Sequence, residues 1–151
     1  MPTRRHIAFS SAAFGLALAA LLAQRPAPPP LRTTTLVVGG VSYRLEVAET
    51  SRSRARGLSG RAALANDGGM LFVFRETGRH TFWMKDMRFP IDILWLDERW
   101  CVVESASHVR PDSYPARYGL SPSSRDAVEL PAGTADAQGV AVGRCFEPPR
   151  M

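Results

Sequence analysis

Lysine is almost absent from this 151-residue chain. Of its 19 lysine and arginine residues only Lys85 is a lysine, and it lies in the run FWMKDM. An ammonium is a compact point charge whose pKa falls on burial, whereas a guanidinium is planar and stays charged. A position that keeps lysine in an arginine-rich chain therefore marks a candidate site. The alternative is a single surviving lysine codon with a solvated side chain, the usual state of lysine.

Histidine is nearly as scarce, which bears on metal chemistry. Beyond the N-terminal segment the chain has only His80 and His108, with no cysteine or carboxylate at ligand spacing from both. Transition-metal sites use three or four such ligands. The sequence therefore predicts no metal and no cofactor. The methionines Met70, Met84 and Met87 are expected to fill gaps in the core rather than to bind copper.

Long apolar runs are absent except at the N-terminus. Arg4 and Arg5 precede the uncharged, Ala- and Leu-rich residues 7–23. This order is typical of an export signal over residues 1–23, by the general or the twin-arginine route. The 17 apolar residues are also close to the minimum for a spanning helix, so the segment is either a cleaved peptide or an N-terminal anchor. The protein is expected to be exported, periplasmic or anchored facing the periplasm.

The rest of the chain has room for one domain. Residues 24–33 are a Pro-rich linker that favours an extended conformation. Residues 34–147 are predicted to form the domain, and 148–151 a tail. Without residues 1–23 the net charge falls from +5 to +3, since two arginines and no acids are lost. So small an excess, with scattered arginines, argues against a nucleic-acid partner.

The chain has two cysteines, Cys101 and Cys145. In an exported protein an even number favours a disulfide. A separation of 44 residues indicates a structural bridge rather than a redox pair. Two buried free thiols are the alternative.

Short β-branched and aromatic runs between turn residues predict a mainly β domain. We expect a single compact sandwich or rolled barrel of about seven to eight strands, with one or two short helices. Gly39 and Gly40 predict a tight hairpin, and Thr50 or Ser51 and Gly57 bound a helix over 51–56. Residues 107–125 are irregular and are expected to be a binding loop or cover. The expected strands are 36–38, 41–47, 70–74, a return over 80–85, 91–96, 100–103, 127–130 and a last strand near Cys145.

Five motifs in fixed order carry a resemblance to a known family. They are GLSGR at 57–61, GMLFVF at 69–74, FWMKDM at 82–87, FPIDI at 89–93 and VELPAG at 128–133. With them the chain resembles the bacterial and archaeal family catalogued as domain of unknown function 192, over roughly residues 37–146. The resemblance implies a compact, often exported β-rich domain with no established activity. Members usually carry threonine or another small residue where this chain has Met87, and commonly Asn at Asp86.

Charged residues inside apolar strands are the candidate site. Arg61, Lys85, Asp92 and Glu129 interrupt apolar or glycine-turn sequence. In a half-buried strand such residues simply alternate outward, which is the structural alternative. If they converge, Arg61 and Lys85 hold an anionic group while an acid fixes the lysine.

Trp83, Met84 and Trp95 are the expected walls of that site. The sequence thus predicts a domain that binds a small or peptide-like ligand, or an envelope protein, with membrane contact only through an uncleaved N-terminal segment. A hydrolase or transferase using Lys85 ranks below binding, because a neighbouring carboxylate favours the charged amine. Ser59 lies in no Gly-x-Ser-x-Gly elbow. The third alternative is a structural accessory domain.

Overall fold

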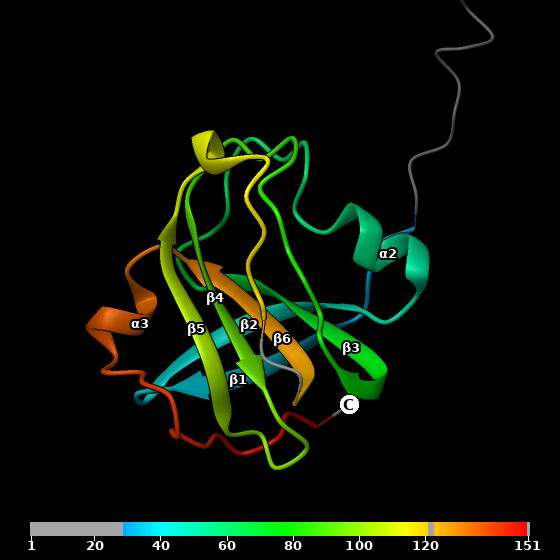
Figure 1. Cartoon of the computed structure of the whole chain (residues 1–151). Coiled ribbons are helices and arrows are strands. Elements are labelled where there is room, and N and C mark those ends of the chain that lie inside the picture. Colours follow the sequence, from blue (N-terminus) through cyan, green and yellow to red (C-terminus); the bar gives the residue numbers. More distant parts are fainter. Residues whose placement is uncertain (1–28, 121–122, 151) are drawn as a thin grey trace, which may run out of the picture. The chain divides into compact units, whose positions relative to one another are not determined.

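In the computed structural model, which describes residues 29–120 and 123–150, six strands form one sheet in the order β1-β2-β3-β6-β4-β5 (Figure 1). All neighbours are antiparallel except β2 and β3, which are parallel. The strands are β1 (Thr33–Val38), β2 (Val41–Ala48), β3 (Gly68–Gly78), β4 (Ile91–Leu96), β5 (Val102–Val109) and β6 (Ser124–Pro131). The helices are α2 (Ser51–Arg56), α3 (Thr134–Ala137) and the 3₁₀ turn Pro111–Ser113. The predicted signal, 1–23, and residues 24–28 of the linker lie outside the described residues.

The prediction of a mainly β domain with short helices is confirmed, but the sheet is not closed into a barrel and has six strands. The prediction of a return strand over 80–85 is wrong, because no strand lies between β3 and β4. Both edges of β3 are already paired, with β2 and β6, so the following segment crosses the sheet and pairs only at the bridge Phe82–Tyr118. The expected last strand is likewise reduced to the bridge Cys101–Cys145.

Local signals in the sequence placed the first elements correctly. Gly39 and Gly40 have φ values of 59° and 88°, as a primed hairpin turn between β1 and β2 requires. Helix α2 begins after Thr50, whose hydroxyl accepts a hydrogen bond from the Ser53 amide in a capping box, and it ends at Gly57. These two predictions are confirmed.

The sheet is covered on both faces at its centre. Every residue of β4 is buried, and so is the middle of β6. One apolar cluster contains Leu94 and Val128 and is covered by α3 and Phe146. The other contains Trp95 and Phe72 and is covered by Leu58, which follows α2. The two helices therefore lie on opposite faces of the sheet (Figure 1).

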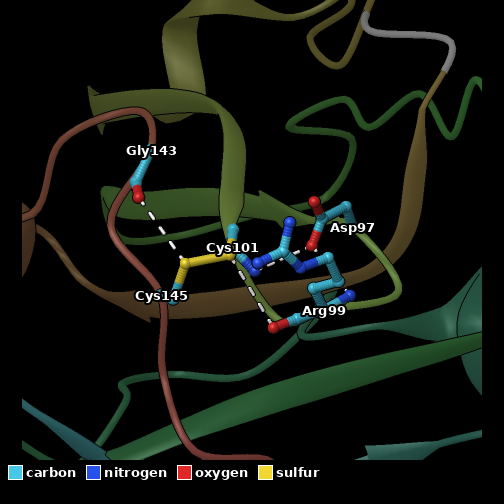
Figure 2. The surroundings of a disulfide bond; sticks show 5 residues. All are labelled: Asp97, Arg99, Cys101, Gly143 and Cys145. Carbon is cyan, nitrogen blue, oxygen red and sulfur yellow. Dashed lines mark hydrogen bonds between the residues drawn. A yellow bond between two sulfur atoms is a disulfide. The ribbon is translucent and has the colours of Figure 1, made fainter.

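A disulfide ties the C-terminal segment to the start of β5. Cys101 and Cys145 are bonded, and Asp97 Oδ1 accepts hydrogen bonds from the Arg99 and Cys101 amides at 2.9 Å each (Figure 2). The neighbouring Phe146 amide donates to the Trp100 carbonyl, and its ring is buried in the core. The bridge thus fixes the segment that covers the α3 face.

The first prediction concerns this disulfide. A cross-link that closes a loop of this length stabilises a fold by about 4 kcal/mol in the chain-entropy account. We expect the double variant Cys101→Ser/Cys145→Ser to lose up to about that much unfolding free energy in urea titrations. Reducing agent should lower the urea midpoint of the native protein and leave that of the variant unchanged. Equal midpoints for the oxidised native protein and the variant would contradict the role.

Candidate functional site

A pocket of about 210 Å³ opens on the face of the sheet that α2 covers. We call it the Glu129 pocket. Its lining residues are Phe72, Phe74 and Glu129 from the sheet, Thr81, Phe82, Trp83 and Met87 from the segment after β3, and residues 54–59 from α2 and its following turn. It therefore combines aromatic walls with one buried carboxyl, the composition typical of a ligand site.

Glu129 is buried because its strand leaves it nowhere else to point. It lies on β6 with Met70 of β3 and Ile93 of β4 opposite it, and both of these are fully buried. The Glu129 side chain is itself only 6% exposed, and its Oε2 has no hydrogen-bond partner among the described residues. An unpaired buried polar group costs about 1–3 kcal/mol. Burial of this carboxyl therefore destabilises the fold, since no described residue forms a hydrogen bond with Oε2.

Burial raises the pKa of Glu129 to about 8, and the positive charge of Arg61 lowers that pKa only in part. A carboxyl in apolar surroundings favours its neutral form because ionisation would place an unsolvated charge there. At neutral pH Glu129 is thus protonated, and it presents an O–H donor as well as a carbonyl oxygen.

Arg61 is held beside the pocket by an ion pair. Its guanidinium donates two hydrogen bonds to the Glu46 carboxylate, with Nη2 to Oε2 at 2.8 Å. This pairing lowers the pKa of Glu46 and raises that of Arg61. Glu46 stands opposite Met70 and Met70 opposite Glu129, so the two acids lie in one row across the sheet. Arg61 therefore forms hydrogen bonds with Glu46 and acts on Glu129 only through its positive charge.

Three aromatic rings of the pocket lining, Phe72, Phe74 and Phe82, pack together, and Trp95 lies behind Phe82. Phe82 packs edge-on against Phe72 at 4.8 Å between ring centroids and against Trp95 at 5.7 Å. The Phe74 ring is 6.5 Å from Phe82, and the Arg54 guanidinium lies 5.1 Å from the Phe74 centroid. Arg54 Nη1 also donates to the carbonyls of Glu49 and Val73, which fixes that guanidinium at the edge of the pocket.

Two of the sequence motifs are joined through backbone carbonyls. Ser59 Oγ donates to the Lys85 carbonyl at 2.9 Å, and the Gly60 amide donates to the Asp86 carbonyl at 2.8 Å. Asp86 has a φ of 58°, and the Met87 amide donates to the Met84 carbonyl, so residues 84–87 form a turn that needs a left-handed residue. This link holds the two sides of the pocket together.

Lys85 is exposed and does not enter the pocket. Its Nζ lies 5.7 Å from the centroid of the Trp83 ring, and the Arg117 guanidinium lies 4.7 Å from the same centroid. No described acid forms a salt bridge with Lys85. Tyr114 also packs against Trp83, so the loop expected to act as a cover does reach this side of the site.

Asp92 belongs to the opposite face and has a structural role. Its Oδ1 accepts from the amides of His108 and Gly133, and its Oδ2 accepts from Ala135 at 2.7 Å. Gly133 and Ala135 are at the start of α3, which has no side-chain cap of its own. Asp92 therefore caps α3 from a neighbouring strand, satisfying amides that a helix start leaves unpaired.

Of the predicted site residues, Trp83 and Glu129 line the pocket, and Arg61 acts on Glu129 only through its charge. Lys85 stays on the outer side of the pocket, and Asp92 is on the other face. Of the predicted walls, Met84 and Trp95 are buried behind the pocket rather than lining it. Sequence reasoning missed Glu46 and Phe82. Phe82 lies in a motif that we identified, but a strand was expected there, and Glu46 had the alternation of an ordinary exposed strand residue.

Two other features, a second buried acid and a larger groove, are weaker candidates for a ligand site than the Glu129 pocket. Asp126 Oδ1 also lacks a partner and burial raises the Asp126 pKa, but the side chain lines neither of these hollows. A groove of about 710 Å³ lies between β1 and residues 144–150. Its described lining contains no buried unpaired group, so nothing in it points to a ligand.

Two further findings apply to residues 29–120 and 123–150. Within them no three His, Cys, Asp or Glu side chains are placed to hold a metal ion. No helix in this part of the chain is long and apolar enough to cross a membrane.

Residues 34–147 match the family model of domain of unknown function 192, described as uncharacterized ACR. The chain belongs to this family. The sequence resemblance is thereby confirmed, and the matched residues include the whole sheet except Thr33, together with the Glu129 pocket. No curated protein matches the chain.

Two solved structures share the fold of this chain. A candidate transcription regulator from Sinorhizobium meliloti 1021 is 27% identical with a TM-score of 0.73, covering 80% of this chain and 97% of its own. A protein of unknown function from Novosphingobium aromaticivorans DSM 12444 is 26% identical with a TM-score of 0.65, covering 83% of this chain and 96% of its own. Neither supplies an established activity for the family.

The buried carboxyl predicts a specific pH dependence of stability. The folded pKa of Glu129 is about 8, above the ordinary value of 4.5, so the folded state binds more protons than the unfolded state between these limits. Stability from this group is therefore fully present below about pH 4.5 and is lost as pH rises to about 8. The loss approaches about 1.4 kcal/mol per pH unit.

Glu129→Gln removes this titration and nearly preserves the shape. The difference in unfolding free energy between the native protein and this variant, measured in urea from pH 5 to 9, should shift in favour of the variant as pH rises. Subtracting the variant cancels the contribution of Asp126, whose pKa is also raised. Parallel curves would show that Glu129 is ionised in the folded protein.

Asp92 should behave as a structural residue. Asp92→Ala leaves three amides without their acceptor, so we expect a loss of at least about 3 kcal/mol of unfolding free energy. Asp92→Asn should fall between this variant and the native protein, since only one oxygen remains. The exposed Asp67→Asn is the matched control and should change stability by less than about 0.5 kcal/mol. A similarly small effect of Asp92→Ala would contradict the capping role.

Proposed function

We propose that this domain binds a small organic ligand in the Glu129 pocket, on the outer side of the cytoplasmic membrane. The observation that carries the proposal is the Glu129 carboxyl, which is buried beside aromatic rings with Oε2 unpaired. Buried polar groups in native proteins almost always have partners. A ligand in the pocket would supply the missing one.

The dimensions of the pocket suit a single ring. An apolar cavity of about 150 Å³ accommodates benzene. The Glu129 pocket, at about 210 Å³, has room for one ring with one or two small substituents. The edge-on rings of Phe72 and Phe82 give it flat apolar walls. A longer peptide would have to remain largely outside.

Of the predicted site residues, the proposal keeps Glu129 and Trp83 as pocket lining, with Arg61 outside the lining, where its charge acts on Glu129. Lys85 is given an outer role, where its ammonium and the Arg117 guanidinium flank the exposed Trp83 ring. Because Trp83 lines the pocket, a charged substituent that projects past its ring would be near both cations. Asp92 has no part in binding, because three amides occupy its carboxylate.

Export is supported by two independent features. Residues 1–23 have the order of an export signal, and the described part of the domain contains a disulfide. Disulfides persist in the periplasm and are rare in the cytosol. A small ligand is the proposed partner, rather than nucleic acid, and membrane contact is expected only through the N-terminal segment.

Acid–base catalysis is the second candidate, favoured by the Glu129 pKa of about 8. A general acid or base works best when its pKa is near the working pH. No second titratable side chain among the described residues forms a hydrogen bond with Glu129, and Lys85 lies outside the pocket. Binding therefore ranks first. Mass spectrometry distinguishes the two: a binder returns its ligand unchanged, and an enzyme converts it.

A pocket-filling variant tests the proposal. Ala55 is exposed on α2 and lines the pocket, so Ala55→Trp should occupy the opening with little effect on folding. Single-ring compounds that shift NMR signals of Phe82 and Met87 in the native protein should lose at least about tenfold in affinity, roughly 1.4 kcal/mol.

The matched control is Arg52→Trp, which adds the same ring on the same helix outside the pocket lining. It should leave the affinity unchanged. If no single-ring compound shifts these signals, the pocket is not a ligand site and the domain is better regarded as a structural accessory.

A further inference from the structure

We infer that the Glu129 pocket selects monocyclic carboxylates, whose acceptor oxygen receives a hydrogen bond from the Glu129 side chain, and rejects cationic amines of the same shape. The inference rests on the proposed function and adds the chemical class of the ligand. Two observations carry it, the neighbours of Glu129 and the charges around the pocket, and the raised pKa of Glu129 agrees with them.

The neighbours of Glu129 give it no hydrogen-bond donor. Met70 and Ile93 stand opposite it on the two flanking strands, and Oε2 is unpaired. A carboxylate without a hydrogen-bond donor from its protein neighbours is strongly disfavoured among apolar side chains. The group is therefore set to donate its own proton, and it needs an acceptor on the ligand.

The charged and titratable groups around the pocket are mainly basic. They are Arg54 and Arg56 on α2, Arg61 paired with Glu46, Lys85 and Asp86 in the turn 84–87, His80 stacked on Phe74, and Arg117 over Trp83. Neither β3 nor β4 presents a charged residue directly opposite Glu129. An incoming ammonium would meet several guanidinium groups, whereas an anion is attracted by them.

Arg56 is the cation best placed to meet the ligand. It lines the pocket and is exposed, while Arg54 is occupied by two backbone carbonyls and Arg61 by Glu46. One ligand carboxylate can then accept from Glu129 with one oxygen and be attracted by Arg56 through its charge. Recognition of this kind requires the protonated form of Glu129, whose pKa is about 8.

Three single-ring probes of similar size separate the alternatives: benzoate, benzamide and benzylammonium. NMR titration of the native protein should give affinities in the order benzoate, benzamide, benzylammonium, with at least about tenfold between the first and last. Above about pH 8 the benzoate affinity should fall about tenfold per pH unit, because Glu129 loses its proton.

Three variants assign the effect to named groups. Glu129→Gln keeps an N–H donor, so benzoate binding should persist within a few-fold and lose its decline above pH 8. Glu129→Met removes the donor and should weaken benzoate at least tenfold. Arg56→Gln should weaken benzoate more than benzamide. Thermal unfolding of each variant shows that it is folded before its affinity is used.

The outcomes separate this inference from the proposed function. Benzylammonium binding more tightly than benzoate, or benzoate affinity rising with pH, would overturn the carboxylate class while leaving a ligand pocket in place. If none of the three probes, nor any other single-ring compound, shifts the signals of Phe82 and Met87, both proposals fail. Benzoate binding that Glu129→Met does not weaken would show that the carboxyl takes no part, and the inference would fall.

Discussion

A strand that is hydrogen-bonded along both edges and covered on both faces leaves its side chains little contact with solvent. β6 is such a strand, lying between β3 and β4 with an apolar layer above and below. The period of two in a strand sends Glu129 into one layer and Asp126 into the other. The unusual chemistry of Glu129 follows from this placement, because the same residue on an edge strand would be solvated.

Much of the framework could be predicted from local sequence signals. The Gly39–Gly40 turn, the Thr50 cap and the end of α2 at Gly57 depend only on neighbouring residues. The order of the strands does not. β6 inserts between β3 and β4 although it follows both in the chain, and this insertion removed the edge that a strand over 80–85 would have needed. The periodicity of apolar residues within one segment does not show which distant strand that segment pairs with.

The candidate site was predicted only in part, since Trp83 and Glu129 line the pocket whereas Lys85 and Asp92 do not. Asp92 and Glu129 both interrupt apolar strands, and alternation cannot tell which face carries amides and which carries rings. Asp92 accepts hydrogen bonds from three backbone amides, whereas Glu129 lies opposite the apolar side chains of Met70 and Ile93. The rarity of lysine drew attention to the turn 84–87, which does belong to the site. The turn contributes through the backbone carbonyls of Lys85 and Asp86, however, and not through the Lys85 ammonium.

The link between Ser59–Gly60 and the turn 84–87 uses main-chain acceptors at Lys85 and Asp86. The side chains at these two positions are exposed and contribute nothing to the link itself. The rim can therefore change its charge and size while the opening keeps its width. Such a separation lets one framework be retuned for different molecules, provided that residue 86 still accepts a left-handed backbone.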